Sequence, residues 1–188
     1  MVTASLKDFA RAVLLIDGGG DVASGAALMA APSLDQSPLV DYVKYYRGLV
    51  ALRQSRLDAA AATFASIGGA GIRSHVADQA LWRLAEVQEQ RGEYTLASET
   101  WARLLVGKPA DVDRVAHRLG VARERAGDPR GAVEAHRLVY YDYPLSADAD
   151  ASGEVLERLR GVEVTFPARV DKTRGRADAL YSARRWTL

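Results

Sequence analysis

The sequence predicts an all-α fold, a right-handed α-solenoid of about ten helices paired as antiparallel helical hairpins. Small, aromatic and proline residues recur at a stride of 35 residues. No stretch of convincing length alternates apolar and polar residues as a strand would. We expect a single solenoid over 1–188, made of a diverged amino-terminal hairpin at 1–38, repeats at 39–72, 74–109 and 112–144, and carboxy-terminal helices with an incomplete last repeat at 146–188.

The clearest copies of the repeat lie in 74–109 and 112–144. In the first of these, a Leu-Ala pair is followed at fixed distances by a turn glycine, an alanine, an aromatic residue and a proline: Leu84, Ala85, Gly92, Ala97, Trp101 and Pro109. The next copy keeps the same distances with Leu119, Gly120, Gly127, Ala132, His136 and Pro144. Because both glycines and both prolines are 35 residues apart, the register holds along the whole repeat.

A looser copy precedes these two. Gly48, Ala60 and Phe64 keep the spacing, but Ser55 stands in place of the turn glycine and no proline closes the repeat. Two antiparallel helices approach closely only where one presents Gly or Ala and the other packs a ring beside it. The pattern resembles the tetratricopeptide repeat, which has a Leu-Gly pair in its first helix and Ala with an aromatic residue in its second.

Further helices are expected around these repeats. Leu6 to Ile16 and Val22 to Ala31 are helix-like runs separated by Gly18–Gly20. Asp128-Pro129 combines an N-cap residue with a proline at the first helical position, which is typical of a helix start. The stretch from Arg176 to Trp186 is expected to form the first helix of another hairpin, so we expect the chain to be a fragment of a longer protein.

The carboxy-terminal third carries a more specific resemblance. Val-Tyr-Tyr-Asp-Tyr-Pro-Leu-Ser at 139–146, followed by Ala147, Ala149 and Leu156, resembles a hairpin end in the amino-terminal, U-domain-like solenoid of soluble lytic murein transglycosylases. The stretch 176–181, with Arg185 and Trp186, resembles the same solenoid. That family cleaves peptidoglycan strands in the periplasm through a separate lysozyme-like domain, whose Glu-Ser pair and Gly-Leu-Met-Gln stretch are absent from this chain.

The resemblance therefore implies the accessory helical domain of a longer lytic transglycosylase, placed in the periplasm or cell envelope. A Tyr-Pro-x-Ser helix end, here 143–146, is equally typical of envelope tetratricopeptide proteins that assist outer-membrane assembly or coordinate cell-wall synthesis. A free-standing adaptor in the envelope or in a cytoplasmic complex is the alternative.

The composition argues against several classes of function. The 25 Lys and Arg nearly balance the 24 Asp and Glu and are interspersed with them, whereas nucleic-acid binders gather a basic excess on one face. We therefore expect no nucleic-acid partner. The longest apolar stretch near the start, Ala12 to Ile16, is too short for a membrane span or a signal-peptide core. Because there are no cysteines, thiolate nucleophiles and Cys-ligated zinc sites are excluded.

Residue types that carry catalysis or bind metal are scattered. The three histidines, His75, His117 and His136, are far apart in the sequence and form no His-x3-His or Glu-x2-His pair, whereas a metal site needs several converging ligands. His136 holds the ring position of its repeat and is expected to be packed in the core. Glu86 and Glu89, beside Arg83 and Arg91, have the spacing of a solvated, ion-paired helix face. We expect no catalytic residue, no metal and no cofactor in this chain.

A binding groove is the remaining functional candidate. In tetratricopeptide-like solenoids the first helix of each hairpin lines the concave surface, and residues three or four apart share a helix face. The predicted lining residues come from three first helices: Tyr42, Tyr45, Leu49, Gln79, Trp82, Glu86, Arg114, His117 and Val121. Aromatic anchors beside Arg and Glu suit an extended peptide or a neighbouring helix, although the same aromatics could instead pack against an adjacent helix or a further domain.

The predicted partner is therefore a protein or peptide, or a downstream domain of the same protein. The open carboxy-terminal helix also allows a homo-oligomer, because an uncapped repeat exposes its apolar face. A chaperone-type carboxylate clamp, which resemblance to the repeat family would allow, needs paired Lys and Asn side chains, and the chain has no Asn.

Overall fold

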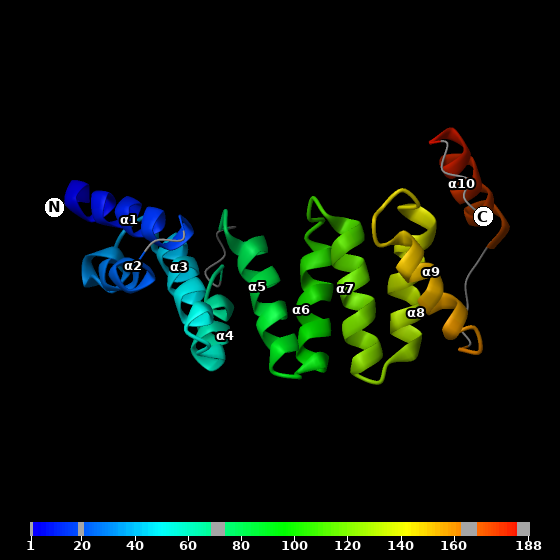
Figure 1. The fold of residues 1–188 in the computed structure, drawn as a ribbon, viewed down its shortest axis with the longest axis horizontal. Coiled ribbons are helices and arrows are strands. Elements are labelled where there is room, and N and C mark those ends of the chain that lie inside the picture. The colour runs from blue at the N-terminus through cyan, green and yellow to red at the C-terminus, as the bar shows by residue number, and fades with distance from the viewer. Residues whose placement is uncertain (1, 19–20, 69–73, 163–168, 184–188) are drawn as a thin grey trace. The chain divides into compact units, whose positions relative to one another are not determined.

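The computed structural model describes residues 2–18, 21–68, 74–162 and 169–183. These residues form ten α-helices and contain no strand, which confirms the predicted all-α fold. The chain divides into two compact units, Met1–Arg91 (unit 1) and Gly92–Leu188 (unit 2). Their boundary falls inside the predicted 74–109 repeat, at the turn residue Gly92, whose φ is +73°. Figure 1 labels the helices of each unit in chain order.

Unit 1 begins with the diverged amino-terminal helices. Its elements are α1 (Val2–Asp17), α2 (Val22–Met29), the short 3-10 helix η1 (Pro32–Leu34), α3 (Val40–Arg53), α4 (Leu57–Ala65) and α5 (Ala77–Gln90). Gly18 ends α1 by donating its backbone N–H to Leu14, while Gly19 and Gly20 lie outside the described residues. The carboxylate of Asp21 then caps α2 by accepting from the backbone N–H groups of Ala23 and Ser24. Within this unit α1 packs on α2, and α4 packs between α3 and α5.

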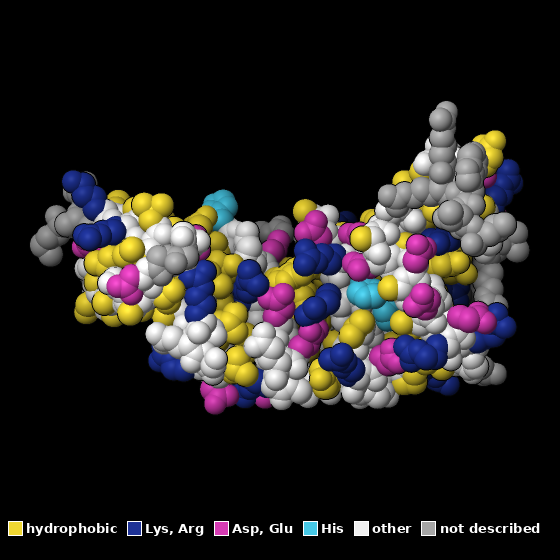
Figure 2. Space-filling view, viewed as in Figure 1, with side chains coloured by type: hydrophobic (Ala, Val, Ile, Leu, Met, Phe, Trp, Pro, Cys, Tyr) yellow, Lys and Arg dark blue, Asp and Glu magenta, His cyan; other side chains and the backbone are white. Residues whose placement is uncertain are grey.

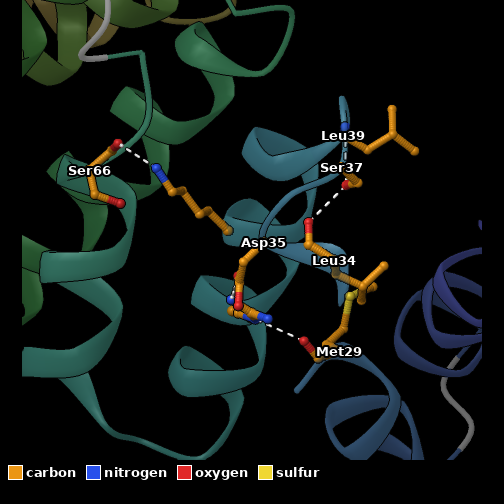
Figure 3. Close-up of polar contacts among 8 residues, drawn as sticks. Met29, Leu34, Asp35, Ser37, Leu39 and Ser66 are labelled. Carbon is orange, nitrogen blue, oxygen red and sulfur yellow. Dashed lines mark hydrogen bonds and ion pairs between the residues drawn. The ribbon is translucent and has the colours of Figure 1, made fainter. Parts of the chain in front are cut away.

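Polar side chains of α3 fasten this helix to its neighbours, as Figure 3 shows. The Arg47 Nε donates to the carbonyl oxygen of Met29 at 2.8 Å, and its guanidinium also pairs with Asp35. On the other side, the Lys44 ammonium donates to the carbonyl oxygen of Ser66 at 3.3 Å. These bonds satisfy backbone carbonyls at the carboxyl ends of α2 and α4, which have no partner within their own helices.

Unit 2 contains the best-preserved repeats. Its elements are α6 (Tyr94–Val106), α7 (Val112–Arg125), α8 (Pro129–Arg137), the π-helical turn η2 (Leu138–Asp142), α9 (Ala149–Arg158) and α10 (Arg169–Ser182). Asp128 caps α8 as predicted, because its carboxylate accepts from the backbone N–H of Gly131 at 2.9 Å and Pro129 takes the first helical position. Helices α6, α7 and α8 lie side by side (Figure 1).

The last helix begins seven residues before the predicted start at Arg176, while Arg185 and Trp186 lie outside the described residues. Arg176 fastens this helix to η2: the guanidinium lies 3.7 Å from the centre of the Tyr140 ring and donates to the Tyr140 carbonyl oxygen at 2.8 Å. A second contact joins Lys172 to Asp142 at 2.6 Å. The π-helical turn therefore supplies the main docking point of α10.

The contact between a small residue and a ring is present in both units at the predicted positions. A Cβ atom on Gly48 would lie 2.5 Å from Cε1 of Phe64, and one on Gly120 would lie 2.5 Å from Nε2 of His136. No side chain can occupy so short a gap, so glycine is what lets α3 approach α4 and α7 approach α8. Alanines expected beside the rings are fully buried, each 0% exposed: Ala60, Ala97 and Ala132.

Two helix ends, one in the loose repeat and one in a well-preserved repeat, share the same backbone conformation. Ser55 has a φ of +57° and Gly127 a φ of +79°, so both lie in the left-handed region. In both turns the second residue donates back to a carbonyl five positions earlier, from Arg56 to Ala51 and from Asp128 to Arg123. This is the hydrogen bond of a Schellman helix end, for which glycine is the favoured residue. Ser55 therefore adopts the backbone conformation of the glycine that it replaces.

His136 is fully buried in unit 2, as its ring position predicted. The hydroxyl of Ser152, also fully buried, lies 3.2 Å from Nδ1 of His136 and 3.0 Å from Nδ1 of His117. Because a hydroxyl donates only one hydrogen, it can donate to one imidazole and accept from the other. Ser152 on α9 thereby links α7 and α8.

The pKa of His136 is lowered to about 4, mainly by burial and next by the nearby charge of His117, while Glu124 opposes this shift and Arg158 adds to it. The Nε2 of His136 has no hydrogen-bond partner among the described residues, so the charged imidazolium, which carries a proton on each ring nitrogen, would bury a charge with one N–H unsatisfied. The folded state therefore favours neutral His136.

Acid should consequently weaken unit 2. The unfolded imidazole titrates near its ordinary pKa of 6.5, above the folded value, so the unfolded chain binds more protons between these two values and stability falls as pH falls through 6.5 towards 4. We expect the free energy of unfolding to fall by about 2 kcal/mol between pH 7.5 and pH 5 because of this group. Urea unfolding followed by circular dichroism measures it.

His136→Phe is the matched variant, because phenylalanine holds the same place in the first repeat. The variant should lose this part of the pH dependence and keep the helical signal. An equal fall in stability in the variant and the parent chain would contradict the assignment to His136.

Candidate functional site

The nine predicted groove residues fall on three helices in two units. Helix α3 carries Tyr42, Tyr45 and Leu49, and α5 carries Gln79, Trp82 and Glu86, all in unit 1. Helix α7 of unit 2 carries Arg114, His117 and Val121. The site is therefore described for each unit in turn.

The α3 residues are partly buried rather than freely exposed. The ring of Tyr45 lies 5.8 Å from the ring of Phe64 and 5.8 Å from that of Tyr46. Leu49 packs, like Tyr45, against the core cluster formed by α3, α4 and α5. One side of these side chains thus packs against the core, and the other side is available for contact with a ligand.

The α5 residues form a small polar network. The indole Nε1 of Trp82 donates to Oε1 of Glu86 at 2.9 Å, and the guanidinium of Arg83 donates to Oε2 of the same carboxylate at 2.8 Å. The predicted ion-paired face is therefore present at Arg83 and Glu86, while Arg91 pairs with Asp58 at 3.0 Å. Gln79 is exposed at the start of the same helix.

A cavity of about 350 Å³ opens beside Tyr45 and Leu49. It draws residues from α1, α3 and α5 of unit 1: Asp17, Tyr45, Tyr46, Leu49, Leu52, Arg53 and Arg83. Its walls combine leucine side chains and phenol rings with two guanidinium groups and a carboxylate. That lining suits an apolar side chain whose backbone or neighbouring polar groups reach the arginines.

The polar groups of the cavity are held in place by internal bonds. The Tyr46 hydroxyl donates to Oδ2 of Asp17 at 2.6 Å, and burial together with this carboxylate raises the pKa of the phenol above its ordinary value. Burial works against the charge on Arg83, but hydrogen bonds to Tyr45 and Glu86 outweigh it and raise the pKa of the guanidinium. The cavity therefore keeps a neutral phenol at Tyr46 and a charged guanidinium at Arg83 across the ordinary pH range.

The α7 residues have mixed surroundings. Arg114 is exposed and Val121 is half-buried. The half-buried His117 uses its Nδ1 in the contact with Ser152, and its ring packs edge-on against His136 with centres 5.3 Å apart. Its imidazole is thus engaged within unit 2, and contact with a ligand would be limited to its exposed edge.

Some lining residues of the cavity were not found from the sequence. They are Asp17, Tyr46, Leu52, Arg53 and Arg83. Tyr46 and Arg83 directly follow predicted groove residues, so a wider stripe along each first helix would have included them. Leu52 and Arg53 stand three and four residues after Leu49, so a longer stripe along the same helix would have included them too. Asp17 could not be found this way, because the packing of the diverged helix α1 beside α3 has no repeat pattern to mark it.

No group of three or more His, Asp or Glu side chains converges as a metal site would within the described residues. Among the helices that the structure describes, none is long and apolar enough to span a bilayer. On the face of the molecule shown in Figure 2, acidic and basic side chains are mixed over α7, α8 and α9, in line with the balanced composition.

Comparison with known proteins supports the fold. No family model matches the sequence, and no curated protein matches it. A solved structure described as the MamA RS-1 ArsTM double mutant is similar, with a TM-score of 0.59 over 84% of this chain and 93% of that chain, at 14% sequence identity. MamA is a tetratricopeptide-like helical protein, and at this identity the likeness concerns the fold alone. The chain accordingly has an all-α, tetratricopeptide-like fold.

Proposed function

We propose that the chain is a non-catalytic helical scaffold that binds a segment of a partner protein, or a peptide, along the first helices of its repeats. The observation that carries the proposal is the cavity beside Tyr45 and Leu49, two residues that the repeat pattern predicts to line a groove. Tetratricopeptide-like folds favour protein partners, and the cavity gives this chain a specific place for one of them.

The lining of the cavity supports recognition of a peptide rather than catalysis. Apolar walls from Leu49 and Leu52 remove an apolar side chain from water, which supplies most of the free energy of such contacts. Arg53 and Arg83 present donors to backbone carbonyls or carboxylates, and Asp17 is held by Tyr46. An anchor side chain in a pocket with a polar rim is the usual arrangement at the centre of a protein interface.

Substitution of Leu49 tests this proposal. Peptides selected against the full chain from a phage-displayed random library serve as probes, and fluorescence anisotropy gives their dissociation constants. Leu49→Gln should weaken the selected peptides about tenfold, because a polar amide replaces an apolar wall of the cavity. Truncating Tyr45 is less informative, since its ring also packs on Phe64.

Leu57→Gln provides the matched control. Leu57 on α4 is also partly buried and packs against the same core cluster, but it does not line the cavity. The control should lose similar stability and retain peptide binding. Equal losses of affinity in the two variants would show that binding depends on stability alone, and unchanged affinity in Leu49→Gln would place the peptide elsewhere.

We further propose, on the resemblance of 139–146 and 176–186, that the scaffold is the accessory domain of a peptidoglycan lytic transglycosylase in the periplasm or cell envelope. The alternative is a free-standing adaptor of envelope assembly or of a cytoplasmic complex. A lysozyme-like domain encoded directly after Leu188 would support the first, and a stop codon there would support the second. Self-association through the carboxy-terminal helix is the alternative to a partner protein, and a dimer in sedimentation velocity of the unliganded chain would support it.

A further inference from the structure

Among the described residues, α9 is not packed along its length by the helix that follows it, as α3 and α7 are. Within unit 1 α3 is covered by α4, and within unit 2 α7 is covered by α8. Helix α9 packs on α8 and on η2, and α10 packs on η2. Arg176 of α10 reaches the first turn of α9, where it pairs with Asp150 at 3.3 Å. The last two turns of α9 thus lie beyond the main docking point of α10.

A cavity of about 460 Å³ occupies this region of unit 2. It is lined from α8, η2, α9 and the residues that follow α9: Val133, Arg137, Tyr140, Tyr141, Gly153, Leu156, Glu157, Leu159, Arg160 and Val162. A Cβ atom on Gly153 would lie 2.7 Å from the Tyr140 ring, so glycine again lets two elements approach closely. The cavity has room for a few side chains from one face of a helix, rather than for a whole helix.

The chemistry of the cavity selects its occupant. Val133, Leu156 and Leu159 give an apolar floor. At the rim, the guanidinium of Arg137 lies 5.7 Å from the centre of the Tyr141 ring, and Arg160 pairs with Glu157 at 2.6 Å. The rim therefore carries two positive charges and one negative charge. Side chains that fit here are apolar at helical spacing and acidic at the flanks.

We propose that this surface binds an amphipathic helix of a partner protein, with apolar residues at positions i, i+3 and i+4 in the cavity and acidic residues facing Arg137 and Arg160. The helix completes the hairpin of α9 in the way that α8 completes the hairpin of α7. This surface differs from the groove of unit 1 and does not depend on it.

The chain's own α10 is a poor occupant of the same surface in a second copy. Its sequence carries four basic residues and two acidic ones, so it would bring further positive charge to a basic rim. Repulsion between like charges at an interface weakens the binding of a wrong partner. The charge balance therefore favours an acidic helix from another protein over an exchange of α10 between copies.

Three synthetic peptides test the proposal against the full chain. The first is a fluorescein-labelled 16-residue amphipathic helix with leucines on one face and glutamates on its flanks, the second replaces the glutamates by lysines, and the third is the chain's own segment 169–182. Fluorescence anisotropy should give a micromolar dissociation constant for the first peptide and at least about tenfold weaker binding for the other two.

Charge reversal at the rim provides the decisive variant. The Arg160 side chain is 76% exposed, so Arg160→Glu should leave the fold intact, weaken the acidic peptide about fivefold and strengthen the lysine peptide. Arg174→Glu on α10 is the control, because it makes the same change of net charge at an 82% exposed side chain outside the cavity. It should leave both affinities unchanged.

Several results would overturn the proposal. These are absence of binding by the acidic peptide, equal affinity for the acidic and lysine peptides, equal or tighter binding of segment 169–182, or equal effects of Arg160→Glu and Arg174→Glu. Sedimentation velocity of the unliganded chain should show a monomer at micromolar concentration. A dimer that Arg160→Glu dissociates would assign the surface to a second copy of the chain instead.

Discussion

The fold depends on helices that come close enough for a glycine of one to touch a ring of the other. Gly48 meets Phe64 and Gly120 meets His136 at distances that leave no room for a methyl group. This contact fixes the separation of each pair, because a side chain at either glycine would bring a Cβ atom within 2.5 Å of the ring atoms. The alanines beside these contacts are fully buried as well.

The sequence predicted this part of the structure because the small residues and rings that form the contact recur at a constant spacing. The turn at Ser55 keeps the left-handed backbone of the repeat although its residue is not glycine. The role of Ser152, the π-helical turn at Leu138–Asp142 and the side of α3 covered by α1 could not be predicted. Each of these features depends on a contact that does not recur at equivalent positions of the repeats, so no regular spacing in the sequence predicts it.

The functional surfaces are by-products of the same geometry. Close pairs of helices leave shallow spaces at their edges, and both cavities have apolar walls with arginines at the mouth. Of the predicted groove residues, Tyr45 and Leu49 line one of these cavities, whereas His117 contributes to a buried contact inside unit 2. Sequence periodicity identifies which residues share a helix face. Only the packing of neighbouring helices decides which of these residues line a cavity and which lie in the core.

A double-mutant cycle on Gly48 and Phe64 tests the central contact most directly. Urea unfolding of the parent chain, Gly48→Ala, Phe64→Leu and the double variant gives the coupling between the two positions. Because the smaller side chain makes room for the added methyl group, the double variant should be more stable than the sum of the single losses predicts, by at least about 1 kcal/mol. Losses that add to within about 0.5 kcal/mol would show that the glycine and the ring do not constrain each other.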